Sequence, residues 1–108
     1  MIQEPKPSVG NMQVGFTAMT NQGPMETWGY RVVFLGYEAF EFVAHRDVSH
    51  PSRWRVAEVS TGFAIGARQL TRQAAIEMAT QVLQEKTPDE LRGMIADALK
   101  IRTFGERK

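Results

Sequence analysis

Residues 30–45 read YRVVFLGYEAFEFVAH, and this stretch decides the fold. Apolar side chains alternate on both sides of Gly36, as Tyr30, Val32 and Phe34 before it and as Phe40, Phe42 and Ala44 after it. Alternation of this kind is the period of a half-buried strand, and a glycine between two such runs marks a turn. A loop of Gly36, Tyr37 and Glu38 sets Val32 opposite Phe42 and Phe34 opposite Phe40. We therefore predict an antiparallel hairpin whose aromatic side chains share one face.

The segment WRVAEVSTGFAIGAR, residues 54–68, predicts a second hairpin. A two-residue loop of Thr61 and Gly62 would set Arg55 opposite Arg68, which places two like charges side by side. A three-residue loop with Gly62 in the left-handed conformation avoids this pair. It also aligns apolar residues on one face, namely Ala57, Val59, Phe63, Ile65 and Ala67. We therefore adopt the three-residue loop.

Upstream of the first hairpin, an alternating run predicts a further strand, with Met12, Val14, Phe16 and Ala18 as its apolar positions. The segment TNQGPMETWG, residues 20–29, breaks this pattern with two glycines and a proline. Residues 1–11 contain two prolines and few large apolar groups. Such a segment buries too little surface to offset the entropy of ordering it, so we predict a flexible N-terminal tail over residues 1–11.

After Leu70 the apolar period changes from two residues to about 3.6, which indicates helices. The first helix has Thr71 as its N-cap and an apolar stripe of Ala75, Met78, Ala79, Val82 and Leu83. The second begins with a capping box of Thr87 and Glu90 around Pro88, and its stripe is Leu91, Met94, Ile95, Ala98 and Leu99. Two amphipathic helices need one apolar surface to cover, and the aromatic face of the sheet provides it.

These patterns together predict a single α+β domain over residues 12–108. It consists of an antiparallel sheet of four to five strands, containing two hairpins, followed by two C-terminal helices packed on one face. The place of the first strand in the sheet stays open. The chain has no cysteine, and its start, MIQEPKPSVG, lacks the apolar core of a signal peptide. We therefore expect a soluble, cytoplasmic protein with no membrane partner and no cofactor.

The opposite face of the sheet is where we expect function, because its predicted composition is too apolar for a solvated surface. Its apolar centre is Val33, Leu35, Val43, Trp54 and Val56, and its charged border is Arg31, Glu41, Glu58 and Arg68. An apolar centre with a charged rim is typical of protein interfaces. The sequence therefore predicts a non-catalytic binding module that contacts a protein partner or a second copy of itself, as a homodimer.

Nucleic-acid binding is the alternative. From Arg46 to Arg72 the chain has five arginines, at 46, 53, 55, 68 and 72, against Asp47 and Glu58, so five minus two gives this segment a charge of +3. The whole chain carries only +1. Arginines such as Arg53 and Arg55 beside Trp54 have the chemistry to hold phosphate and to stack on a base.

The segment WRVAEVSTGFAIGARQLTRQAAIEMATQVL, residues 54–83, also resembles the second half of a double-stranded-RNA-binding domain in its order of strand, strand and helix. The resemblance covers about 30 of the 108 residues and implies that the start of the last helix contacts RNA phosphates. The chain departs from that family in two respects. Only Arg72 supplies a charge after Thr71, and no helix is predicted before the strands.

A second alternative is a metal site or a small hydrolase at the segment HRDVSHPSRWR, residues 45–55. His45, Asp47 and His50 have donor atoms suited to zinc, and either histidine could serve as a base for a neighbouring serine. The spacing of these residues matches no specific motif. We therefore predict no catalytic or metal-binding residues, and we interpret the segment as a polar crossing between the two hairpins.

Overall fold

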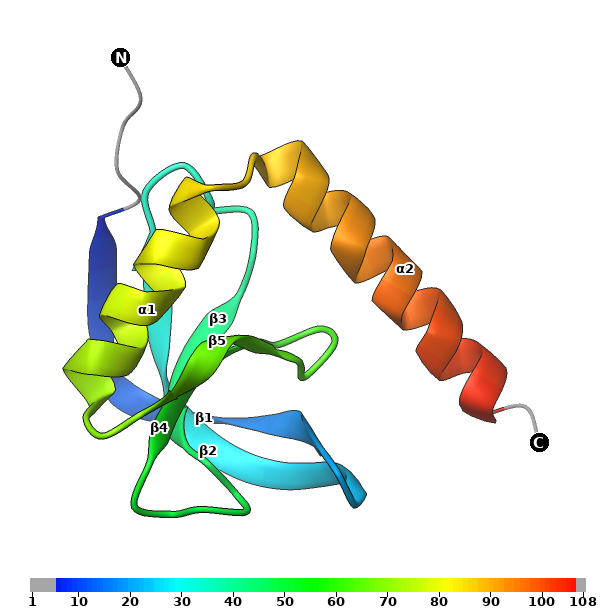
Figure 1. Ribbon diagram of the computed structural model, residues 1–108, viewed down its shortest axis with the longest axis horizontal. Helices are drawn as coiled ribbons and strands as arrows, with labels where there is room; N and C mark the ends of the chain where they lie inside the picture. The colour runs from blue at the N-terminus through cyan, green and yellow to red at the C-terminus, as the bar shows by residue number, and fades with distance from the viewer. Residues whose placement is uncertain (1–5, 107–108) are drawn as a thin grey trace.

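The computed structural model describes residues 6–106, with side chains up to Lys100. Within this range the chain forms an antiparallel sheet of five strands in sequential order, followed by two helices (Figure 1). The strands are β1 (Pro7–Thr20), β2 (Gly23–Phe34), β3 (Phe42–Arg46), β4 (Trp54–Glu58) and β5 (Ala64–Gln69). The helices are α1 (Arg72–Gln84) and α2 (Pro88–Glu106). The predicted α+β class is confirmed.

The hairpin of β2 and β3 has the predicted register, with Val32 opposite Phe42. Its apolar face lies beneath the helices, where Val32, Phe34, Phe42 and Ala44 pack with Ala75, Ile76, Ala79, Leu83 and Leu91. The loop is longer than the predicted three residues, because the ladder ends at the pair Val32–Phe42. Tyr37 in this loop is buried, and its hydroxyl donates to the carbonyl oxygens of Leu83 at 2.8 Å and Lys86 at 2.6 Å. The loop thereby caps the end of α1.

The hairpin of β4 and β5 differs from the prediction by one residue, because Ala57 lies opposite Ala64 and not opposite Ile65. A one-residue slip moves side chains to the other face of a strand pair. Val56 pairs with Ala44 of β3 and Trp54 with Arg46, so both share the helix side with Ala44. The slip between β4 and β5 brings Ile65 to the same side. Gly62 has a φ of +74°, the left-handed conformation that was predicted.

A buried carboxylate explains the longer turn between these strands. The Glu58 carboxylate accepts hydrogen bonds from the backbone N–H of Ser60 at 2.9 Å and of Thr61 at 2.9 Å. It also accepts bonds from both hydroxyls, and the Gly62 N–H donates to the Glu58 carbonyl at 2.8 Å. Charge-assisted bonds of this kind are strong, so the turn forms around Glu58 instead of following the alternation of apolar residues.

Strand β1 begins at Pro7, five residues before the predicted start at Met12. Residues 7–11 of the predicted tail therefore belong to the sheet, and residues 1–5 lie outside the described part. In the ladder of β1 and β2, Val9 lies opposite Val32, and the register shifts between Val9 and Gln13. β1 and β2 are joined by Asn21 and Gln22 alone, so the predicted break over residues 20–29 is mostly strand.

The sheet curls so that the end of β1 returns to the turn between β4 and β5. The Met19 N–H donates to the carbonyl oxygen of Gly62 at 2.9 Å. This closure forms a second apolar cluster on the face away from the helices, which contains Phe16, Ala18, Val43 and Ala57. Much of the face that was predicted to be bare is therefore covered by the chain's own first strand.

Both helices begin as predicted. The Thr71 hydroxyl accepts from the Ala74 N–H at 3.1 Å, and the Thr87 hydroxyl accepts from the Glu90 N–H at 3.1 Å. α1 lies along the sheet, whereas α2 contacts the core through Leu91 and Ile95 and then extends away from it (Figure 1). Met94 is half exposed. Among the described residues, no helix is long and apolar enough to cross a membrane.

Candidate functional site

The predicted contact face does not exist as one surface. Arg31 and Val33 are exposed on the face away from the helices, but Val43 on the same face is buried beneath β1. Trp54 and Val56 lie on the helix face, and Val56 is fully buried there. The physical reason is the combination of the register of β3 and β4, which pairs Val56 with Ala44, with the return of β1. Three of the predicted apolar contacts are thus parts of two internal clusters.

The two histidines weighed above as the second alternative are separated in the structure. His45 is buried at the side of Phe16, with the ring centroids 4.8 Å apart, and its Nδ1 lies 2.8 Å from the Arg46 carbonyl oxygen. His50 is exposed in the loop between β3 and β4. Among the described residues, no group of three or more His, Cys, Asp and Glu side chains could hold a metal ion.

The loop of residues 47–53 is ordered by its own hydrogen bonds. The buried Asp47 carboxylate accepts from the Ser49 N–H at 3.2 Å and forms an ion pair with Arg68 of β5. At the backbone, the Asp47 N–H donates to the Arg53 carbonyl at 2.9 Å. The loop therefore presents its outer side chains from a fixed backbone.

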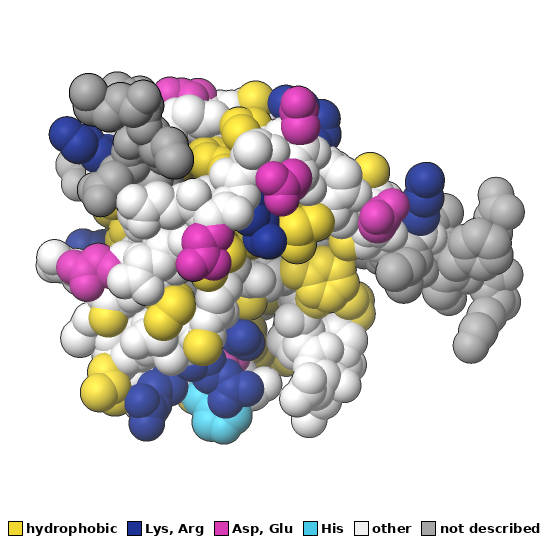
Figure 2. Space-filling view, turned by 45° about the horizontal axis from the view of Figure 1, so that its top comes forward, with side chains coloured by type: hydrophobic (Ala, Val, Ile, Leu, Met, Phe, Trp, Pro, Cys, Tyr) yellow, Lys and Arg dark blue, Asp and Glu magenta, His cyan; other side chains and the backbone are white. Residues whose placement is uncertain are grey.

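Five arginines lie in this loop, on the strands beside it or at the start of α1: Arg46, Arg53, Arg55, Arg68 and Arg72. We call this region the arginine end. Arg55 lies opposite His45, on the face away from the helices, and is half-buried. Figure 2 shows dark-blue side chains gathered beside a histidine at the lower edge of the molecule. Within the described residues, only Arg68 of the five forms an ion pair with a carboxylate. Glu41 pairs with Arg31, and Glu58 is bound within its turn, so neither neutralises the arginine end.

Two of these arginines stack on aromatic rings of the helix face. The Arg46 guanidinium lies 4.9 Å from the ring centre of Trp54, and that of Arg72 lies 4.8 Å from the ring centre of Tyr30. Arg46 also donates to the Pro51 carbonyl at 3.0 Å. Stacked guanidinium groups keep their N–H donors at the ring edges, where they can bind an anion. The arginine end is therefore a positively charged surface with partly fixed donors.

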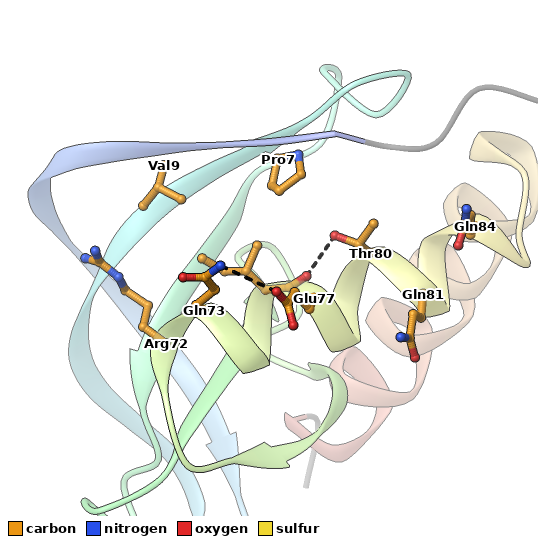
Figure 3. Close-up of a pocket in the computed structure, with 9 residues that line it drawn as sticks. Pro7, Val9, Arg72, Gln73, Glu77, Thr80, Gln81 and Gln84 are labelled. Atoms are coloured by element: carbon orange, nitrogen blue, oxygen red, sulfur yellow. Dashed lines mark hydrogen bonds between the residues drawn. The ribbon is translucent and has the colours of Figure 1, made fainter.

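The arginine end opens into a groove between β1 and α1 (Figure 3). This groove has a volume of about 600 Å³, with Pro7 and Val9 on the strand side and Gln73 and Thr80 on the helix side. Arg72 belongs both to this groove and to the stack on Tyr30. The helix side of the groove is mainly amide and hydroxyl groups.

Trp28 is a surface residue that the sequence patterns did not single out. Its relative exposure is 65%, and it lies on β2 two residues before Tyr30. Alternation along a strand places Trp28 and Tyr30 on one face. The two-residue spacing of Trp28 from Tyr30 could have indicated that both lie on one face of a strand. The glycines and the proline of residues 20–29 indicated a loop there instead.

No protein-family model, no curated protein and no solved structure matches this chain. The order of β4, β5 and α1 does reproduce the strand, strand and helix of the resemblance to double-stranded-RNA-binding domains. Within residues 6–106, however, both helices follow the sheet, and Arg72 is the charged residue at the start of α1. The site is therefore interpreted from its own geometry.

Proposed function

We propose that this protein is a non-catalytic module that binds nucleic acid through the arginine end. The observation that carries the proposal is the grouping of the exposed Arg46, Arg53 and Arg72 without a carboxylate partner among the described residues. Unpaired arginines on one surface repel one another, and a phosphate backbone relieves that repulsion. Surface ion pairs within the protein explain this grouping less well, because Glu41 pairs with Arg31 and Glu58 is bound within its own turn.

The loop supports the same function. Asp47 anchors the backbone of residues 47–53 from within, and Pro51 and Trp54 hold the Arg46 guanidinium before any ligand arrives. Holding donors in advance reduces the entropy lost on binding. Arg46, Arg53 and Arg72 are exposed and could contact about three phosphates.

The test is the double variant Arg46→Ala/Arg53→Ala in a titration with a labelled oligonucleotide. For three phosphate contacts to a single strand, raising the salt from about 50 to about 200 mM should weaken wild-type binding roughly 20-fold. The variant should bind more weakly at low salt and should lose most of this salt dependence.

The matched control is Arg31→Ala/Arg92→Ala, which removes the same two charges from arginines that pair with Glu41 and Asp89. It should bind as the wild type does. Equal weakening in the control, or binding that does not respond to salt, contradicts the proposal.

Contact with a protein partner or with a second copy of the chain is the second candidate. It is favoured by Val33 and Leu35, which are 39% and 40% exposed and lie beside the Arg31–Glu41 ion pair. A small apolar patch with a charged border is typical of the centre of an interface. This patch is what is left exposed of the surface predicted from the sequence.

For self-association we expect light scattering to give the mass of a dimer, and Val33→Asp to reduce it to the mass of a monomer. Leu70→Asp is the control, because Leu70 is 69% exposed on a different segment. A monomer mass for the wild type at every protein concentration contradicts self-association.

A further inference from the structure

Trp28 is exposed, and a glycine on the neighbouring strand leaves space for its ring. Gly15 of β1 lies directly opposite Trp28 in the ladder. A Cβ atom at Gly15 would lie 3.4 to 3.7 Å from three carbons of the six-membered ring. The ring therefore rests against the backbone of β1, while 65% of the residue's surface stays open to solvent. Such a ring is supported from the protein side and available to a ligand on the other.

Trp28 borders the arginine end. The ladder of β2 and β3 ends at the pair Gly29–His45, and the next positions along the two strands are Trp28 and Arg46. Arg46 pairs in turn with Trp54 of β4. Tyr30, with Arg72 stacked on it, follows Trp28 on the same face. The Trp28 ring leans toward β1, and the Arg46 guanidinium leans toward Trp54 of β4, so the Arg72 guanidinium on Tyr30 is the phosphate donor next along the strand from the ring.

The charge around Trp28 differs from that of the arginine end. A cavity of about 350 Å³ beside the ring is lined by Gly15, Phe16, Thr17, Glu26 and Thr27. Its charged group is the Glu26 carboxylate, which repels phosphate but can accept hydrogen bonds from the amino groups of bases. The surroundings of Trp28 therefore suit an uncharged base.

We infer that the ligand is single-stranded nucleic acid, with one base stacked on Trp28, the adjoining phosphate bound by Arg72 and phosphates further along the strand bound by Arg46. This inference rests on the proposed function and adds the form of the nucleic acid to it. Bases in a duplex are stacked on one another, so their faces are closed to a protein ring, whereas a single strand presents them. A stacking ring beside a cationic path is the arrangement used for single strands.

The test compares Trp28→Leu with Trp28→Phe, because leucine keeps the apolar volume and phenylalanine also keeps an aromatic face. The probes are an oligothymidylate of about 12 nucleotides, a duplex of the same length, heparin and polyglutamate. For the wild type we expect quenching of tryptophan fluorescence by oligothymidylate, and a preference for it over the duplex. Trp28→Leu should bind oligothymidylate about tenfold more weakly and lose the quenching, as expected for one stacked base, while its affinity for heparin stays the same.

Trp28→Phe should restore most of the affinity, and Phe63→Leu is the control for an exposed aromatic residue away from the site. Equal binding of oligothymidylate, duplex and heparin, without quenching, overturns the single-strand inference and leaves the proposed function standing. If polyglutamate binds as tightly as oligothymidylate, the single-strand inference is overturned in favour of an acidic protein as the ligand. Binding of none of the four probes overturns the proposed function itself.

Discussion

His45 is a buried titratable residue, and its surroundings make stability depend on pH. Burial lowers the pKa of His45 from its ordinary value of 6.5, and Arg55 acts in the same direction, while the Arg46 carbonyl and Asp47 oppose them. The unfolded chain therefore takes up a proton near pH 6.5, whereas the folded chain takes it up only at lower pH. The free energy of unfolding should be constant above this range and should fall as the pH drops below it.

Urea unfolding at about pH 7.5 and about pH 5.5 measures this effect, since the carboxylates titrate mainly at lower pH. The midpoint should fall at the lower pH for the wild type and for His50→Gln, which changes the exposed histidine. His45→Gln should remove most of the fall. An equal fall in His45→Gln would mean that another group is responsible.

Glu58 shows why one part of the site could not be predicted. In the sequence it is a polar residue at an alternating position, which indicates a solvent-facing side chain on a strand. In the structure it is 4% exposed and accepts hydrogen bonds from Ser60 and Thr61. Apolar periodicity carries no information about such a polar network, and the network decides the register of β4 and β5. The face on which Ile65 lies follows from this register, whereas that of Trp54 follows from its pairing with Arg46 of β3.

At the scale of elements, the turn at Gly62 joins the two ends of the sheet. Gly62 has a positive φ, and a Cβ atom there would collide with the carbonyl oxygen of Thr17 and crowd the Met19 nitrogen. Only glycine therefore allows β1 to approach this turn while the Met19 N–H donates to the Gly62 carbonyl.

We predict that Gly62→Ala destabilises the protein more than Gly36→Ala does. Gly36 has a similar φ of +88°, but nothing lies within 4 Å of its Cβ position. Both variants should incur about 1–2 kcal/mol from the left-handed conformation, and Gly62→Ala about 1–3 kcal/mol more from the collision. Urea unfolding measures the difference. Equal destabilisation of the two variants would show that the contact of β1 with the turn contributes little.

The elements that were predicted correctly depend on contacts between residues near one another in sequence. The register of Val32 and Phe42 follows from apolar alternation on two neighbouring segments of the chain, and the capping box at Thr87 lies within one turn of helix. The return of β1 to Gly62 joins residues far apart in the chain, and no periodic pattern indicates it. For this reason the covering of Val43 was missed, and with it the division of the predicted contact face.

On the scale of the whole molecule, charge is distributed unevenly. The net charge of the chain is +1, yet the described ion pairs leave four arginines of the arginine end without a carboxylate. A global charge count therefore conceals a local field, and local fields determine how a charged ligand approaches. The sequence did indicate the arginines from Arg46 to Arg72, but it did not indicate that Arg72 stacks on Tyr30, two residues from the exposed Trp28.

The direction of α2 has a consequence for cooperativity. After Ile95 the helix extends away from the sheet, and none of residues 96–100, the last whose side chains the structure describes, belongs to the hydrophobic core (Figure 1). Helical segments of this length are marginal in water on their own. The part of α2 between Ile95 and Lys100 can therefore unfold and re-form locally while the strands remain intact, so local opening of the helix and global unfolding of the sheet are separate events.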